Sequence, residues 1–169
     1  MRRRDDETFR QFAESRSSAL YRAACLMTSG DTHLAEDLVQ ETLGRMYTVW
    51  NRRRCIDNPD AYAKKVLVRV YLTYRRRRSS HEQPASWLPD TPVEIGDSTL
   101  RITLLQALGN LPYKDRAVVV MRFLDDMSIE QTAAAMRMTS SAVRSRSSRA
   151  MAKLRAELGQ TGFAELTTA

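Results

Sequence analysis

A stretch near the middle of the chain strongly limits what this sequence can fold into. Residues 79–98 read SSHEQPASWLPDTPVEIGDS and contain three prolines, four acidic side chains and no Lys or Arg. Because a proline restricts its own backbone and that of the residue before it, neither a long helix nor a central strand is expected here. The stretch is also too long for an ordinary connection inside one compact domain. It predicts an extended acidic linker between two domains.

The two blocks that flank this linker are both basic. Residues 1–78 carry 17 basic and 10 acidic side chains, and residues 99–169 carry 10 basic and 6 acidic ones. Clustered Arg on a chain of net charge +7 is typical of proteins that bind a polyanion, usually nucleic acid. An ordinary solvated surface is the alternative. The negative linker would then stay off the DNA that its flanks bind, although an acidic spacer without any binding role fits it as well.

Apolar periodicity in the first block is helical. It predicts one helix up to the Ser-Gly pair at 29–30, where glycine favours a helix end. A second helix should begin after Asp31, a good N-cap, and run to about Trp50. A third should begin at Asn58 and Pro59 and continue through the arginine run at 75–78.

The second block predicts helices around 99–108 and 113–124, followed by a helix pair. Ser128 and Gln131 fit a capping box ahead of a short helix over about 129–136. After a tight turn, a longer helix should run from Thr139 or Ser140 to about Leu158, with a short frayed tail behind it. This is helix-turn-helix spacing. The predicted fold class is therefore all-α, with two small helical domains, 1–78 and 99–169, joined by the extended acidic linker 79–98.

Other classes of protein fit the sequence poorly. The two histidines, His33 and His81, have no triad or carboxylate pair around them, and no Gly-rich loop could cradle a phosphate. We therefore expect no enzyme, no catalytic residue, no metal and no cofactor. Cys25 and Cys55 lack C-x-x-C spacing and are expected to be reduced thiols. No apolar run approaches the roughly 18 residues of a membrane span, so a soluble cytoplasmic protein without a membrane partner is expected.

One face of the second predicted helix carries an acidic patch. At helical spacing its members share one arc opposite the apolar stripe; they are Asp37, Gln40, Glu41 and Gly44. A glycine in mid-helix costs about 1 kcal/mol relative to Ala, which close approach of another backbone could offset. The patch therefore predicts a docking surface for a basic partner helix, with a plain solvated face as the alternative.

The third predicted helix and the loop before it combine basic and aromatic side chains. Cations neutralise phosphates, aromatic rings stack on unpaired bases, and an Arg-rich loop suits a pocket for an extruded base. The candidates are Trp50, Arg52, Arg53, Arg54, Tyr62, Lys65, Arg69, Tyr71, Arg75 and Arg76. Tyrosines in a core and merely solvated arginines are the alternative.

The last predicted helix has a polar outer face suited to DNA. Its inward positions include Val143, Ala150 and Leu154, which turns four polar side chains outward: Ser141, Arg144, Ser145 and Ser148. Arg can bond guanine with two hydrogen bonds, and Ser accepts either kind of partner. Arg146 and Arg149 lie toward the flank, which suits phosphates. A generic helical hairpin is the alternative.

Two motifs together resemble a known family. AEDLVQET with the basic aromatic helix after it, and LPYKDRAVVVMRFLDDMSIEQTAAAMRMTSSAVRSRSSRAMAKLR, are similar to bacterial RNA polymerase sigma factors of the extracytoplasmic-function type, over roughly residues 8–78 and 99–158. AYAKKVLVRVYLTYRRRR resembles the actinobacterial branch. The resemblance implies a non-enzymatic subunit that directs promoter recognition, DNA melting and transcription initiation. It also implies core RNA polymerase (the clamp helices and flap of the beta subunits) and promoter DNA as partners, with an anti-sigma protein as a further candidate.

The resemblance also implies a role for each candidate surface. The acidic patch would bind polymerase, loop 51–58 with Asn58 and the third helix would hold the melted −10 element, and the last helix would read the −35 element. It adds Ser128 and Ser140 to the −35 residues Ser141, Arg144, Ser145, Arg146, Ser148 and Arg149. Many members have other residues where this chain has Arg69, Thr73, Met127, Met136 and Arg137, which leaves the promoter sequence open.

One competing interpretation is a stand-alone helix-turn-helix regulator that binds duplex DNA as a dimer. It explains residues 99–169 but neither the acidic patch nor the aromatic basic helix.

Overall fold

The computed structural model describes residues 2–50, 56–79 and 98–168, with side chains described over 5–50, 56–79 and 101–159. Every regular element within these ranges is helical, which confirms the predicted all-α class. The elements are α1 (Arg2–Met27), α2 (Thr32–Trp50), α3 (Pro59–Ser79), α4 (Ser98–Gly109), α5 (Tyr113–Val119), the π-helical turn η2 (Val120–Leu124), α6 (Ile129–Met136) and α7 (Ser140–Thr168). All but the first and last residues of the predicted linker lie outside the described residues.

The predicted helix starts are confirmed by their capping bonds. In each case a side-chain oxygen accepts a hydrogen bond of 2.9–3.1 Å from the backbone N–H three residues on; the caps are Asp31, Asn58, Ser128 and Thr139. Gln131 completes the capping box, because its Oε1 accepts from the Ser128 N–H at 2.8 Å. These caps satisfy N–H groups that have no partner inside the helix. They fix where α2, α3, α6 and α7 begin.

Two elements differ from the sequence prediction. The helix expected over 113–124 widens into the π-turn η2, where the Asp125 N–H donates to the Val120 carbonyl five residues back at 2.9 Å. The last helix kinks at Gly159, whose φ of +69° suits glycine, and then continues to Thr168 instead of forming the frayed tail that was expected.

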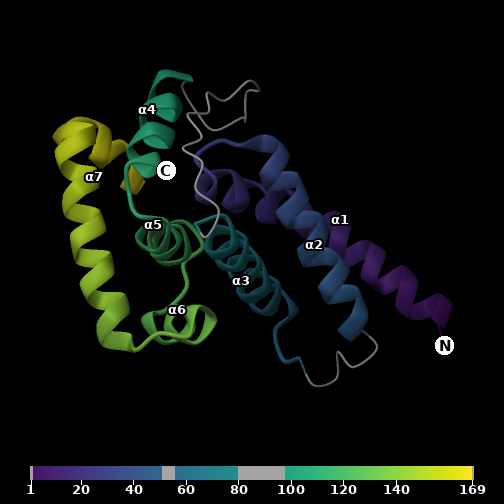
Figure 1. Ribbon diagram of the computed structural model, residues 1–169. Helices are drawn as coiled ribbons and strands as arrows, with labels where there is room; N and C mark the ends of the chain where they lie inside the picture. Colours follow the sequence, from purple (N-terminus) through teal and green to yellow (C-terminus); the bar gives the residue numbers. More distant parts are fainter. Residues whose placement is uncertain (1, 51–55, 80–97, 169) are drawn as a thin grey trace.

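The two predicted blocks pack against each other. We call α1–α3 the N-terminal unit and α4–α7 the C-terminal unit. α3 lies in the middle of the molecule, with α1 and α2 to one side and α5 and α6 to the other, and α7 forms the outer edge (Figure 1). Buried apolar side chains from both units form one continuous cluster, which includes Met27, Leu67, Val118 and Met121. The faces of α3 are therefore divided between the two units.

Candidate nucleic-acid and partner interfaces

The acidic patch lies on the open face of α2. Asp37, Gln40, Glu41 and Gly44 are all exposed, whereas Leu38, Thr42 and Met46 on the opposite face are buried. Glu41 forms an exposed ion pair with Arg45, one turn further along the helix. An added Cβ at Gly44 would meet no atom within 4 Å. The chain itself therefore gives no packing reason for this glycine, and the patch is free to meet a partner.

The predicted base-stacking role of Trp50 conflicts with its place in the structure. Its ring is 4% exposed and lies against Phe9 and Phe12 of α1, at centroid distances of 5.3 and 4.9 Å. Its Nε1 donates to Thr8 Oγ1 at 3.2 Å. In this conformation Trp50 joins α1 to α2 and cannot stack on a base.

Tyr71 is also a core residue. Its ring is fully buried and its hydroxyl has no hydrogen-bond partner within the described residues. Burial raises the pKa of this hydroxyl, and the charge of the nearby Arg116 opposes that rise. The alternative stated for this helix, that some of its tyrosines belong to the core, therefore holds for Tyr71.

The basic side chains of α3 divide into two groups. Lys65 is partly exposed and Arg76 is exposed, so both are available to a polyanion. Arg75 instead lies over the ring of Tyr113 in α5, with its Cζ 5.7 Å from the ring centroid. Arg69 donates to the carbonyls of Ala134 and Ala135 in α6, both at 3.0 Å.

The remaining candidates of the −10 group are only partly described. Tyr62 is partly exposed on α3, and Asn58 is exposed at the start of that helix, where its side chain serves as the N-cap. Arg52, Arg53 and Arg54 lie outside the described residues.

The first half of α7 presents the predicted polar face. Val143, Ala150 and Leu154 are buried against the rest of the C-terminal unit. The exposed residues of the opposite face are Ser141, Arg144, Ser145, Ser148 and Arg149. Arg144 has only a loose ion pair with Glu130 of α6, at 3.9 Å between two largely exposed side chains. This face therefore has donors free for base edges and phosphates.

Arg146 lies differently from its neighbours on α7. Its guanidinium forms a short ion pair with Asp115 of α5, and the two side chains are 26% and 11% exposed. A cation held by a nearly buried carboxylate positions the helix rather than reaching out to a phosphate. Sequence reasoning missed Asp115, although the charged pair Asp115-Arg116 directly before the apolar run AVVVM was an available signal.

Two serines of the predicted −35 group lie at helix starts, and one of them, Ser128, has a structural role. Ser128 is exposed, and both its hydroxyl and its backbone N–H take part in the capping box of α6. Ser140 is partly buried at the first turn of α7.

Arg116 of α5 is a second residue that sequence reasoning missed. This 6% exposed side chain donates to the carbonyls of Gly109 and Leu111, and across the two units to the carbonyl of Met27 at the end of α1. Burial lowers its pKa. All the acceptors of the charged Arg116 guanidinium in these bonds are neutral backbone carbonyls, not carboxylates.

Two other features are absent among the described residues. No group of three or more His, Cys, Asp or Glu side chains in them is arranged to hold a metal ion. None of their helices has both the length and the apolar character that a membrane span requires.

Two family descriptions match this chain. Residues 12–81 match sigma-70 region 2, and residues 101–154 match sigma-70 region 4. RNA polymerase sigma-E factor of Streptomyces coelicolor is 36% identical over 154 residues, which cover 89% of this chain and 85% of that protein. The ECF RNA polymerase sigma factor SigE of Mycolicibacterium smegmatis is 31% identical and covers 89% of this chain and 60% of its own length.

Solved structures support the same fold. The sigma factor RpoE in complex with the anti-sigma factor NepR, from Bartonella quintana, superposes with a TM-score of 0.77 at 24% identity, and covers 91% of this chain and 98% of that one. CnrH in complex with the cytosolic domain of CnrY gives a TM-score of 0.62, also at 24% identity, and covers 90% and 88%. With regions 2 and 4 in order, and actinobacterial relatives matched along most of their length, the chain belongs to the extracytoplasmic-function sigma factors, the non-enzymatic subunits with which RNA polymerase initiates transcription.

Proposed function

We propose that three surfaces of this sigma factor divide the work of initiation. The acidic patch of α2 binds the clamp helices of core polymerase. The outer basic side of α3, together with loop 51–58, holds the melted −10 element, and the first half of α7 reads the −35 element while the C-terminal unit contacts the flap. The strongest support is the arrangement of α7, where Arg144 and the serines around it share an exposed face behind which Val143 and Ala150 are buried.

The chemistry of each surface suits its proposed ligand. Carboxylates at Asp37 and Glu41 attract a basic helix, and the absence of a side chain at Gly44 lets its backbone come close. Lys65 and Arg76 neutralise phosphates, which gives grip without sequence preference. Arg144 has the fork of donors that pairs with the O6 and N7 atoms of guanine. Because polymerase and promoter meet in the cytoplasm, the protein acts there.

Reconstituted transcription tests this division of work. Purified chain added to core polymerase should give run-off transcripts, and mapping their start sites should reveal paired −10 and −35 elements. Asp37→Arg reverses the charge of the patch and should abolish co-purification with core polymerase while leaving the helical circular-dichroism signal intact. Glu14→Arg, the same kind of charge reversal at an exposed position of α1, is the matched control. Unchanged co-purification of the Asp37 variant would refute the proposed docking surface.

An anti-sigma protein is a further proposed partner. The sigma factor RpoE, which has the same fold, was solved in complex with the anti-sigma factor NepR, and CnrH was solved in complex with the cytosolic domain of CnrY. Purification of this chain from its own cells should then yield a second protein in equal amount, which core polymerase displaces. A preparation that contains the chain with polymerase subunits alone contradicts this partner.

A further inference from the structure

The turn between α6 and α7 contains an arginine in a conformation that favours glycine. Arg137 follows the end of α6 with φ +54° and ψ +50°, in the left-handed region. Its backbone N–H donates to the Ala133 carbonyl, and so does the N–H of Met138, at 2.9 Å. These bonds are typical of a helix that ends in a left-handed residue, which is usually glycine because a side chain crowds the backbone there. The chain therefore carries Arg137 at a conformational cost.

No contact among the described residues offsets that cost. The Arg137 side chain is exposed, and within those residues its guanidinium has neither an ion pair nor a hydrogen bond. Burial lowers the pKa of Arg69 on α3, and the positive charge of Arg137 lowers it further. Arg69 itself donates to the carbonyls of Ala134 and Ala135, both at 3.0 Å. The nearest charge that acts on Arg137 is thus a like charge, which disfavours this arrangement further.

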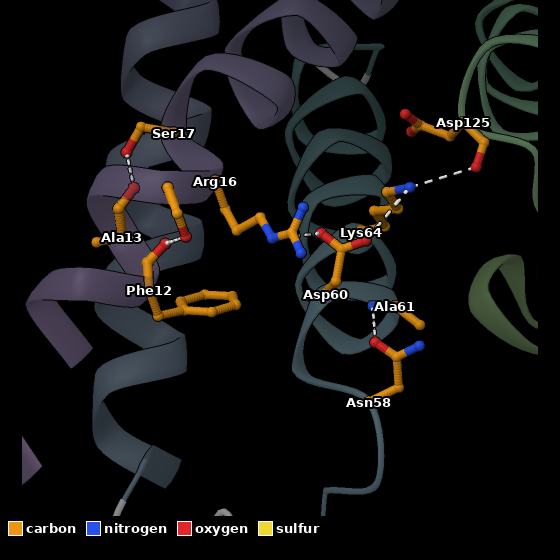
Figure 2. Close-up of polar contacts among 10 residues, drawn as sticks. Phe12, Ala13, Arg16, Ser17, Asn58, Asp60, Ala61, Lys64 and Asp125 are labelled. Carbon is orange, nitrogen blue, oxygen red and sulfur yellow. Dashed lines mark hydrogen bonds and ion pairs between the residues drawn. The ribbon is translucent and has the colours of Figure 1, made fainter. Parts of the chain in front are cut away.

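Other cations close to the boundary between the two units have acidic partners. Figure 2 shows the Asp60 carboxylate with the Arg16 guanidinium on one side and the Lys64 ammonium on the other, each at 3.5 Å. Arg69 has helix carbonyls as acceptors instead. Arg137 has neither kind of partner among the described residues. Its charge is therefore available to a negative group outside the chain.

The position of Arg137 indicates where that group lies. Glu130, Ala134 and Arg137 are exposed and follow one another at helical spacing, so they share one side of α6. The first of them, Glu130, reaches Arg144 of α7 with its ion pair at 3.9 Å. The side of α6 that ends at Arg137 therefore borders the polar face of α7.

The surroundings of the turn favour a phosphate as the negative group. Arg144 and Arg149 are exposed on the neighbouring face, and α7 begins three residues after Arg137 with the end of its dipole that attracts anions. In a helix-turn-helix the first helix crosses the DNA backbone while the second enters the major groove. A residue between the two helices then lies at the edge of the groove, where the phosphates are.

We propose that Arg137 contacts a DNA phosphate at the edge of the −35 element and so fixes how α7 sits in the major groove. It acts as a positioning residue and reads no base. The contact rests on the proposed −35 role of α7. Neutralisation of a phosphate releases bound counterions, and this gain offsets the cost of a left-handed arginine.

Promoter binding by holoenzyme with a full-length Arg137→Gly chain tests the contact. Glycine suits the left-handed turn, so the Tm of the free chain should stay unchanged or rise by up to about 4 °C. Affinity should nevertheless fall severalfold, by a similar factor for every promoter. The plot of log affinity against log salt should become less steep by about 0.9, as expected for one lost phosphate contact. Arg137→Lys keeps the charge and should retain most of the affinity and the slope.

Two controls separate this contact from other effects. Arg10→Ala removes an exposed cation from α1 and should leave the salt slope at the wild-type value. Binding of the Arg137→Gly chain to core polymerase without DNA should equal wild type. Wild-type affinity and slope in Arg137→Gly overturn the proposal. So does a loss confined to one −35 base pair, which would assign Arg137 to a base edge, or weaker binding to core polymerase, which would make its partner a protein.

Neutral methylphosphonates locate the contact on the DNA. When single phosphates around the −35 element are replaced in turn, one position should weaken the wild-type holoenzyme and leave the Arg137→Gly holoenzyme unchanged. A purely structural role of Arg137 would instead give both holoenzymes the same loss at every position, and that result overturns the contact. If the wild-type holoenzyme does not distinguish −35 sequences, the proposed reading role of α7 fails, while the salt slope and the methylphosphonate position still decide the role of Arg137.

Discussion

The two helices that we propose to face DNA, α3 and α7, use similar basic side chains in opposite ways. On α7 the inward cation, Arg146, is paired with Asp115 inside its own unit, which leaves Arg144 and Arg149 exposed. On α3 Lys64 is paired with Asp60 of the same helix, whereas Arg69 and Arg75 reach the other unit instead. An arginine is therefore free for DNA only where a neighbouring acid or carbonyl does not already hold it. The exposed polar face of α7 therefore depends on the Asp115 carboxylate of α5.

Removal of the Asp115 carboxylate should have the largest effect on stability. Asp115→Ala leaves Arg146 without its partner in a largely buried position, and should destabilise the C-terminal unit by about 3 kcal/mol. Urea unfolding followed by circular dichroism measures the change. Glu130→Ala is the matched control, because it breaks an exposed pair at 3.9 Å and should cost far less stability. Equal costs for the two variants would show that Asp115 is not a structural support.

Arg144 and Arg149 on the exposed face of α7 are expected to contact different parts of the DNA, a base edge and a phosphate. If Arg144 contacts a base edge, Arg144→Ala should cost about 1–3 kcal/mol at one base pair of the −35 element and little at a promoter that already lacks this pair. Arg149→Ala should weaken all promoters alike and reduce the salt dependence of binding, as expected for a phosphate contact. Holoenzyme binding to a panel of −35 variants distinguishes the two. A uniform loss for Arg144→Ala would assign that residue to phosphate as well.

The sequence predicted the helices better than it predicted the use of their side chains. Helix starts follow from local chemistry, so Asp31, Asn58 and Ser128 could be identified as caps from a few neighbouring residues. The burial of Trp50 depends on Phe9 and Phe12, some forty residues away. Periodicity alone does not say whether an aromatic at the edge of a helix faces a ligand or another helix, and the exposed stacking role predicted for Trp50 conflicts with its burial.

The contacts between the two units were beyond sequence reasoning for a related reason. The acceptors of Arg69, Lys64 and Arg116 are backbone carbonyls, which every residue carries and which leave no mark in the sequence. The π-turn at Val120–Leu124 likewise contains no proline or glycine from which it could have been predicted. The exposed polar residues of α7, by contrast, could be listed from spacing because the buried residues on the opposite face of the helix are apolar and periodic.

Ser128 offers a smaller and more specific test, since it serves as a cap and is proposed to contact DNA. Ser128→Ala should lower the stability of the C-terminal unit by about 1 kcal/mol through loss of the cap. Ser128→Asp keeps a capping oxygen and should retain most of the stability, yet its charge should repel the DNA backbone. Thermal unfolding and −35 binding, measured on both variants, separate the roles. Wild-type binding by Ser128→Asp would leave Ser128 as a cap alone.

Gly44 lies on α2 in the N-terminal unit. Its substitution should have the smallest effect of these variants. An added Cβ meets nothing within 4 Å, so Gly44→Ala should stabilise the free chain by up to about 1 kcal/mol through helix propensity. If the backbone of a polymerase helix approaches this position, the same methyl group should weaken polymerase binding severalfold, so stability and binding should move in opposite directions. Thermal unfolding and a polymerase titration of one variant measure both. A gain in stability with unchanged polymerase affinity would mean that the partner meets the acidic side chains of α2 but not its backbone.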